Sequence, residues 1–299
     1  MNSFALTQTE QEHFQNKGYV GPFDAVDTES LAALRHTFEK ICAKPFSPIY
    51  NRVTHRDWHL HYRNLLNMVQ RPQVIDRVTS LLGPNLLVWR SSIFNKEPGD
   101  SRLGWHQSSL FAGEEYGLCK PALMPPPTYE VYADLFNVSV WFALDEATVA
   151  NGAVQIAAGT HKKQYPVRKI PLFESEFGRL FKDNLARTGD AARLEELGRR
   201  FANETIFDPD EDGAEIVTLT VKAGQFFIFT DRVMHGSLPN VTKDQRRLGV
   251  NFRVTIPQVE VYPHRKYGDM IDGNDHDVTK HACVMLAGSD TIGHNIYLN

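Results

Sequence analysis

From residue 86 onward the chain consists mainly of short runs of β-branched and aromatic residues, separated by glycine, proline and asparagine. Such runs, with no helices alternating between them, favour a jelly-roll or barrel over a parallel α/β sheet. The expected strands cover residues 85–95, 130–144, 153–157, 216–230 and 248–256. The 299 residues are 42% hydrophobic, which suffices for one large core, so we expect a single domain over residues 1–299.

The first 83 residues show helical patterns instead. Thr7 and Glu10 form a capping box for a helix that is expected to end at Gly18. Asp27 can cap a second helix with one apolar face, and a third helical segment stops at Gly83. We expect this N-terminal part, residues 1–83, to pack on the outside of the sheet.

Residues 166–215 interrupt the strand pattern with two apolar stripes of helical spacing. One stripe contains Phe173 and Phe177, and the other contains Leu194, Leu197 and Phe201. An insertion between the strands of a barrel commonly lies over its mouth, so we expect a helical insertion that acts as a lid or contacts the substrate. The alternative is a helical flap that only thickens the core.

Charge and cysteine content restrict the class of partner. The net charge is -4 without long blocks of one sign, which argues against binding to nucleic acid polymers or to an anionic membrane surface. The sequence contains neither an apolar run of membrane-spanning length nor an apolar signal segment. Cys42, Cys119 and Cys283 lie far apart, as expected of buried thiols in a reducing compartment. These features predict a soluble cytoplasmic protein whose partners are small molecules or single proteins.

Two histidines stand out by their context, His106 in "GWHQSS" and His235 in "FTDRVMHGSLPN". Each is expected where a strand gives way to a turn, although any one of the 12 histidines, taken alone, is more readily explained as structural. Arg247 and Arg253 follow, and Arg253 lies in an apolar strand where a guanidinium needs an anionic partner. A 2-oxoglutarate-dependent iron enzyme requires this set, with two imidazoles for the metal and an arginine for the distal carboxylate.

The sequence resembles the phytanoyl-CoA dioxygenase superfamily and, within it, the non-haem iron halogenases typified by the syringomycin threonine halogenase. The matching segments are "FALTQTEQEHFQNKGYVGPFDA", "LLGPNLLVWR", "PGDSRLGWHQSS", "VWFALDEATVANGAVQIAAGTH", "KAGQFFIFTDRVMHGSLP" and "RLGVNFRVTIP". The resemblance implies a mainly β, cupin-like double-stranded β-helix (jelly-roll) with His106 and His235 as iron(II) ligands. It also implies that Arg253 binds 2-oxoglutarate, that Trp141 lies near this cofactor, and that Arg247 stands behind the direct ligands.

Ser108 departs from the pattern of the ordinary oxygenases. In the hydroxylases of this superfamily the residue two after the first histidine is a carboxylate, and in the halogenases it is alanine or glycine. A serine hydroxyl is uncharged and too short to replace a carboxylate, so we expect this coordination position to accept chloride, to which Ser108 can donate a hydrogen bond. Ser139 matches a small hydroxyl residue that lines the halide pocket in the halogenases that the sequence resembles, and it is a second candidate donor. A carboxylate from elsewhere, Asp100 or Asp231, is the alternative.

The halogenase mechanism implied by the resemblance uses O2, 2-oxoglutarate and a chloro-iron(IV)-oxo species to chlorinate an aliphatic C–H bond. Two other activities stay open: a hydroxylase with a two-histidine iron site, and a relative that has lost the chemistry. The resemblance implies a substrate that is either an amino acid on an aminoacyl carrier protein or a free small molecule, such as a phosphorylated metabolite or a nucleotide. Arg56 and Arg63, in "NRVTHRDWHLHYRN", are candidates for binding a substrate phosphate, and the alternative is a solvated basic loop.

Overall fold

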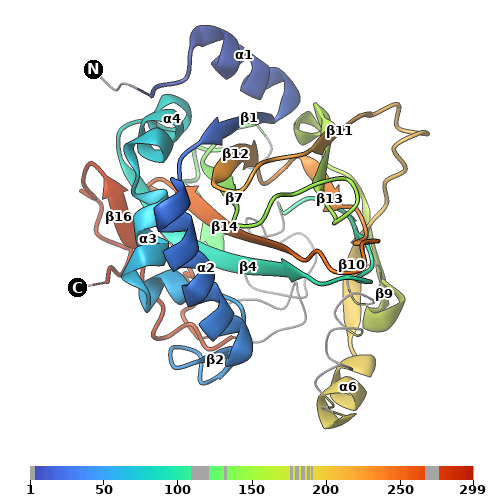
Figure 1. Cartoon of the computed structure of the whole chain (residues 1–299). Coiled ribbons are helices and arrows are strands. Elements are labelled where there is room, and N and C mark those ends of the chain that lie inside the picture. The colour runs from blue at the N-terminus through green and yellow to red at the C-terminus, as the bar shows by residue number, and fades with distance from the viewer. Residues whose placement is uncertain are drawn as a thin grey trace.

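Two antiparallel β-sheets face each other at the centre of the protein (Figure 1). The computed structural model describes residues 4–108, 121–130, 133–175, 178, 182, 186, 189, 191–266 and 276–298. In pairing order, the larger sheet contains β1 (Tyr19–Asp24), β12 (Gln225–Thr230), β7 (Asn137–Ala143), β14 (Arg247–Thr255), β4 (Leu86–Lys96) and β16 (Val284–Ala287). The smaller sheet contains β11 (Glu215–Leu219), β8 (Val154–Ala158), β13 (Met234–Ser237) and β5 (Leu103–His106).

Shorter elements surround these sheets. Among the described residues, three two-stranded ribbons pair β2 (Phe46–Ser47) with β3 (Arg52–Val53), β6 (Leu123–Met124) with β15 (Glu260–Val261), and β9 (Val167–Pro171) with β10 (Phe201–Thr205). The helices are α1 (Gln8–Lys17), α2 (Thr28–Ala43), α3 (Arg63–Val69), α4 (Pro72–Leu82) and α6 (Ala191–Gly198). Single 3-10 turns form η1 (Trp58–Leu60), η3 (Thr160–Lys162) and η4 (Leu172–Glu174).

The strands of the larger sheet alternate between two apolar layers. On β7, Val140 and Phe142 pack outward with Phe38 of α2 and the other N-terminal helices, whereas Trp141 packs inward with Ile156 of the smaller sheet. Figure 1 shows α2, α3 and α4 on the outer side of the sheet that contains β4 and β14. The expected double-stranded β-helix with N-terminal helices packed outside is therefore confirmed.

The helix ends follow from local sequence. Thr7 and Glu10 make the predicted capping box of α1, and Gly18 ends this helix in the left-handed conformation. Asp27 caps α2 by accepting a hydrogen bond from the amide of Ser30. The 1–83 part is not wholly helical, however, because β1 joins the larger sheet beside β12 and a short β2–β3 ribbon follows α2.

The expected strand over 216–230 is two strands. β11 belongs to the smaller sheet and β12 to the larger, and the chain turns between them through Gly224. Gly224 has a φ of +90°, and a Cβ at this position would lie 2.4 Å from the carbonyl oxygen of Val26. A side chain is excluded here because the turn packs directly against the backbone that precedes α2.

The 166–215 insertion differs from the helical segment that we expected. It begins with β9 and ends with β10, which pair in antiparallel register, and α6 lies between them. Phe201 belongs to β10 rather than to a helical stripe, while Leu197 is buried with Leu172 as expected of an apolar helix face. Phe177 lies outside the described residues. Cross-strand pairing between segments 30 residues apart overrides the local helical spacing at both ends.

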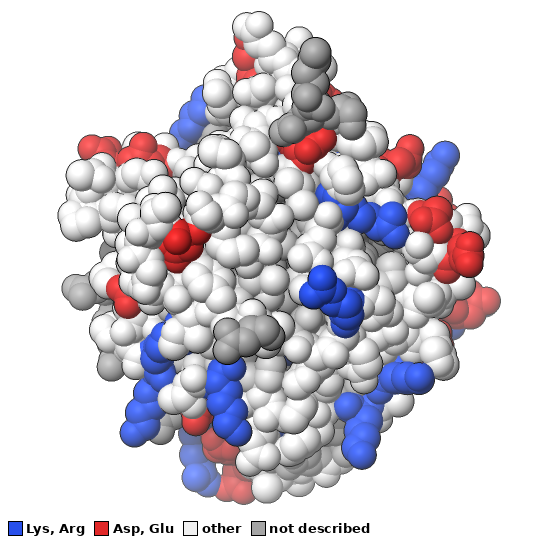
Figure 2. Space-filling view, turned by 90° about the vertical axis from the view of Figure 1, so that its left-hand side faces the viewer, with Lys and Arg blue, Asp and Glu red and all other residues white. Residues whose placement is uncertain are grey.

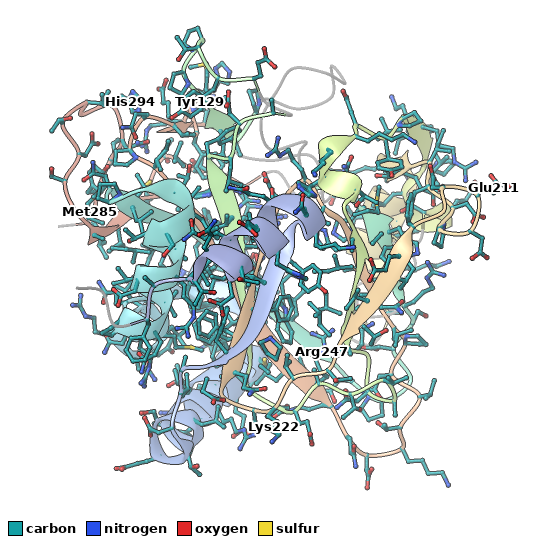
Figure 3. The ribbon with its side chains drawn as sticks, turned by 90° about the horizontal axis from the view of Figure 1, so that it is seen from above. Tyr129, Glu211, Lys222, Arg247, Met285 and His294 are labelled. Carbon is teal, nitrogen blue, oxygen red and sulfur yellow. The ribbon has the colours of Figure 1, made fainter. Side chains whose placement is uncertain are left out.

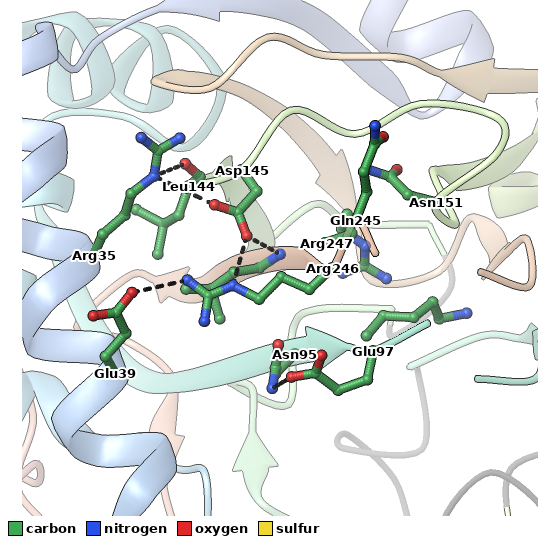
Figure 4. A network of polar contacts seen from close by, with 12 residues as sticks. Arg35, Glu39, Asn95, Glu97, Leu144, Asp145, Asn151, Gln245, Arg246 and Arg247 are labelled. Carbon is green, nitrogen blue, oxygen red and sulfur yellow. Dashed lines mark hydrogen bonds and ion pairs between the residues drawn. The ribbon is translucent and has the colours of Figure 1, made fainter. Parts of the chain in front are cut away.

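An ion-pair network attaches α2 to the end of β7 and the start of β14 in the larger sheet (Figure 4). Asp145, which follows β7, lies 3.3 Å from Nε of Arg35 and 3.0 Å from Nε of Arg246. Nη2 of Arg246 lies 3.3 Å from Oε1 of Glu39, also on α2. The amide of Leu248 donates to the same Asp145 carboxylate, so the start of β14 is held against the helix.

The surface carries both signs of charge. On the face shown in Figure 2, Lys and Arg side chains are interspersed with Asp and Glu around a large uncharged area. Within the described part of the chain, no helix has the length and apolar character that crossing a membrane requires.

Candidate metal centre

His106 and His235 lie side by side on neighbouring strands of the smaller sheet. They are directly opposed residues of the antiparallel pair β5–β13, and their ring centroids are 4.2 Å apart. His106 ends β5 as predicted, but His235 lies inside β13 rather than at the end of the apolar run 225–230. That run is β12, and the chain reverses after it before β13 begins. Strand pairing thus places both imidazoles at one point of the inner surface.

Backbone carbonyl groups fix the tautomer of both rings. Nδ1 of His106 donates to the carbonyl oxygen of Gly104 at 2.9 Å, and Nδ1 of His235 donates to that of Val233 at 2.8 Å. Because a carbonyl oxygen can only accept, each Nδ1 carries the hydrogen and each Nε2 presents a lone pair. This is the arrangement that histidine ligands of metals adopt.

Burial keeps both imidazoles neutral. It lowers the pKa of His106, and the positive charge of Arg253 lowers it further. Burial also moves the pKa of His235 well below its usual value, with smaller contributions from His106 and Arg253. A neutral imidazole pair with two exposed lone pairs fits a divalent metal such as iron(II).

Ser108 is buried beside this pair and is bonded at two points. Its amide donates to the carbonyl oxygen of Asp231 at 2.7 Å, and its Oγ accepts from Nη2 of Arg253 at 3.2 Å. Ser108 and Arg253, which the sequence assigned to the halide and to 2-oxoglutarate, are therefore in direct contact. In a three-ligand site, the residue two after His106 would bear a carboxylate. Here that residue is Ser108, whose hydroxyl accepts a hydrogen bond from the Arg253 guanidinium.

The described residues contain no group of three or more His, Cys, Asp or Glu side chains arranged to hold a metal ion. Asp100 and Asp231, the two carboxylates that sequence reasoning left open, do not complete such a group. Asp100 instead accepts from the amide of Glu97 at 2.8 Å. Burial raises the pKa of Asp231, an effect that the charges of Arg232 and Arg253 oppose. Residues 109–120, which include Cys119, lie outside the described part of the chain.

The inner face of β14 carries further polar side chains between the two sheets. Arg247, Asn251 and Arg253 alternate with residues that pack in the outer core, so they project between the sheets. Nδ2 of Asn251 donates to Oγ of Ser139 at 3.1 Å. Arg247 lies about 20 Å along the strand from Arg253. The two arginines therefore lie in different parts of the interior.

Arg247 is buried against Trp141. Its guanidinium carbon is 5.5 Å from the centre of the Trp141 ring, which stacks on Phe227 at 5.2 Å. Nε of Arg247 donates to the carbonyl oxygen of Gly152 at 3.2 Å. Figure 3 shows Arg247 nearer the centre of the molecule than Lys222, which lies at its edge.

Lys96 is a member of this site that sequence reasoning missed. It is the residue of β4 directly opposite Arg247, and its Nζ donates to the carbonyl oxygen of Ser101 at 2.9 Å, to Oγ of Ser237 at 2.9 Å and to the carbonyl oxygen of Leu238 at 2.6 Å. Burial and the charge of Arg247 lower its pKa to about 7. The negative charge of Asp100 acts in the opposite direction and raises the pKa of both Lys96 and Arg247. Two adjacent buried basic side chains fit an anionic ligand.

Arg56 and Arg63 do not form a solvated basic loop. Arg56 is 9% exposed and its backbone bridges to Ser92 of β4, whereas Arg63 is exposed at the start of α3. Between them Asp57 is buried and accepts from the amide of Ser91 at 2.8 Å. The stretch therefore packs onto the larger sheet at Arg56 and is exposed to solvent at Arg63.

Comparison with known proteins places these features in context. The model of the phytanoyl-CoA dioxygenase family matches residues 14–248. The solved structure of CytC3 with Fe(II) and alpha-ketoglutarate is 26% identical, with a TM-score of 0.69 over 99% of this chain and 93% of that one. The non-heme monooxygenase ThoJ is 23% identical, with a TM-score of 0.64 over 96% and 86% of the two chains. The non-heme alpha-ketoglutarate-dependent epimerase SnoN is 13% identical, with a TM-score of 0.60 over 98% and 95%, and it shares the fold. No curated protein matches the chain.

Proposed function

Because the chain belongs to the phytanoyl-CoA dioxygenase family of iron(II)- and 2-oxoglutarate-dependent oxygenases, we propose that it is a halogenase. It would chlorinate an unactivated aliphatic carbon of a biosynthetic intermediate. The observation that carries this proposal is the site itself: two paired imidazoles with free lone pairs, and a serine bonded to an arginine where a third ligand would stand. A site with two protein ligands leaves room for a halide on the metal.

His106 and His235 would hold the iron through their Nε2 atoms. When bound, with O2 and 2-oxoglutarate as co-substrates, the iron would supply the oxidising power that removes a hydrogen atom from the substrate. The protein's own contribution is orientation: both rings are fixed by backbone carbonyl groups, and the phenyl ring of Phe229 packs edge-on against His235 with ring centroids 4.9 Å apart.

The contacts support Arg247 and Lys96 as the site of the distal carboxylate of 2-oxoglutarate, in place of Arg253. Lys96 bonds Ser237, which lies two residues after His235 on the same face of β13, about 7 Å along the strand. That separation is comparable to the length of a five-carbon dicarboxylate whose other end is at the metal. Trp141, against Arg247, then lies near the cofactor as the resemblance implies.

Arg253 and Ser108 are better placed for the halide. Ser108 is the residue two after His106 and Arg253 donates a hydrogen bond to it, and the charge of Arg253 acts on both imidazoles. Ser139 faces the same interior from β7. A cation and hydroxyl donors suit a small monovalent anion such as chloride.

The substrate is a small molecule, either free or carried as an aminoacyl group on a carrier protein. Arg56 and Arg63 remain candidates for a substrate phosphate. They differ in exposure, because Arg56 is buried beside β4 and Arg63 is exposed on α3.

The deciding experiment reconstitutes the protein anaerobically with iron(II) and 2-oxoglutarate, then adds O2, chloride and candidate substrates, either carrier-bound amino acids or phosphorylated metabolites. Mass spectra of the products should show the chlorine isotope pair. A hydroxylated product with the same yield with and without chloride would identify a hydroxylase. Absence of 2-oxoglutarate consumption with every substrate would identify a non-catalytic relative.

A further inference from the structure

Two serines at the proposed halide site are bonded in the same way by side chains of β14. Oγ of Ser139 accepts from Nδ2 of Asn251 at 3.1 Å, and Oγ of Ser108 accepts from Nη2 of Arg253 at 3.2 Å. Asn251 and Arg253 are two residues apart, so they leave the strand on the same face. Each serine oxygen thus accepts a hydrogen bond from a nitrogen, Nδ2 of Asn251 or Nη2 of Arg253, that cannot itself accept one.

This bonding fixes the direction of the Ser139 hydroxyl. A hydroxyl has one hydrogen and two lone pairs, and the amide nitrogen of Asn251 only donates. With that N–H directed at the oxygen, the Ser139 hydrogen must point elsewhere. The Ser139 side chain is completely buried, so its hydrogen points into the interior rather than into solvent. A buried hydroxyl hydrogen requires an acceptor.

The interior space that this hydrogen faces borders the imidazoles. Ser139 is the residue of β7 directly opposite Phe229, whose ring lies 4.9 Å from that of His235, and it is also directly opposite Arg253. Oδ1 of Asn251 is buried too and has no hydrogen-bond partner among the described atoms. The Ser139 hydrogen therefore fits an acceptor bound in this space, whereas the unpartnered Asn251 oxygen is itself an acceptor and fits a donor rather than an anion.

We propose that Asn251 is a positioning residue which, by donating to Ser139, turns the Ser139 hydroxyl hydrogen toward an anion bound beside His106 and His235. This rests on the proposed function and assigns the halide a specific neutral donor. Arg253 orients Ser108 in the same manner. The asparagine thereby tunes halide affinity without touching the halide.

The size of the effect follows from the hydroxyl torsion. Such a torsion has three staggered positions, so holding one of them improves halide binding by up to about threefold. Asn251→Leu, of similar volume, should weaken chloride binding by about that factor. Asn251→Asp reverses the polarity, because a carboxylate accepts the Ser139 hydrogen and adds a negative charge. Losing a hydrogen bond to a charged partner corresponds to about 10-fold or more.

The assay is a chloride titration of the iron(II)- and 2-oxoglutarate-loaded protein without O2, followed through the visible absorption of the complex. It is carried out on the natural sequence, Asn251→Leu, Asn251→Asp, Ser139→Ala and the double variant Asn251→Leu/Ser139→Ala. Asn251→Leu should weaken chloride binding in the presence of Ser139 and have no effect in the Ser139→Ala background. Affinity for 2-oxoglutarate should stay unchanged in all of them.

Asn95→Leu is the matched control, because Asn95 leaves β4 on the outer face and bonds Glu97 there (Figure 4). If Asn251→Leu weakens chloride binding equally with Ser139 present and in the Ser139→Ala background, the proposal is overturned, since Asn251 would then act on the fold alone. An unchanged chloride affinity in Asn251→Asp would also overturn it. If the natural protein shows no halide-dependent absorption change, the proposed halogenase function fails as well.

Discussion

Lys96 should make the stability of the ligand-free protein rise with pH. Burial beside Arg247 lowers its pKa from 10.5 to about 7, so between these values the unfolded chain binds a proton that the folded chain does not. Folding therefore becomes more favourable as pH increases through this window. At 1.36 kcal/mol per pKa unit, the contribution between pH 7 and pH 9 is about 2 kcal/mol.

The measurement compares the free energy of unfolding by urea at pH 7 and pH 9 in the natural protein and in Lys96→Met. The variant loses the hydrogen bonds of Nζ with Ser237 and with two carbonyl groups, and it has no titrating group at this position. The natural protein should gain about 2 kcal/mol more than the variant over this pH range. The exposed Lys222→Met serves as control and should behave like the natural protein.

The same group links pH to the proposed cofactor site. A dicarboxylate bound beside Lys96 would restore its charge, so 2-oxoglutarate binding at pH 8 should take up a proton, measurable by calorimetry in buffers of different ionisation enthalpy. Equal pH dependence of stability in the natural protein and in Lys96→Met would refute the reasoning, because Lys96 would then be charged inside the fold.

Three further changes test other parts of the structure. Ser108→Asp should complete a three-ligand site, raising iron(II) affinity by about 10-fold or more and abolishing the chloride-dependent absorption change; retained chloride binding would place the halide elsewhere. Arg247→Met should raise the dissociation constant of 2-oxoglutarate by about 10-fold or more, while Arg253→Met should mainly weaken chloride binding, and isothermal titration distinguishes them; the reverse pattern would restore Arg253 as the carboxylate site. Phe38→Ala, at a fully buried position of α2, should cost about 3–5 kcal/mol in chemical unfolding without changing metal affinity; a loss below about 1 kcal/mol would contradict the packing of α2.

Features that depend on neighbouring residues were predictable from the sequence. The capping box of α1 and the Asp27 cap of α2 are local hydrogen bonds, and the alternation of β7 and β14 follows from strand geometry. Sequence context singled out His106 and His235 among the 12 histidines, and the resemblance to a known family implied that they are metal ligands. The structure brings them together as a directly opposed pair.

Features that depend on distant contacts escaped sequence reasoning. Lys96 is recognisable only once β4 pairs with β14, because a lysine next to a glutamate at a strand end normally faces solvent. The sequence around Arg56 is typical of a basic loop. In the structure this stretch packs onto β4, because Asp57 accepts a hydrogen bond from Ser91 and the backbone of Arg56 bridges to Ser92. Likewise, the pairing of β9 with β10 could not be inferred from a segment with helical spacing.

The hydrogen bonds from each imidazole to the carbonyl group two residues earlier have a consequence for metal exchange. Ring orientation in His106 and His235 is imposed by the chain, so emptying the site needs no rearrangement of the ligands and refilling it needs no search among rotamers. A chelator should therefore remove the metal ion without unfolding the protein, and other divalent ions should bind to the same two histidines. Selectivity among metals would then depend on which metal ions are available and on the anions bound with them, rather than on induced fit.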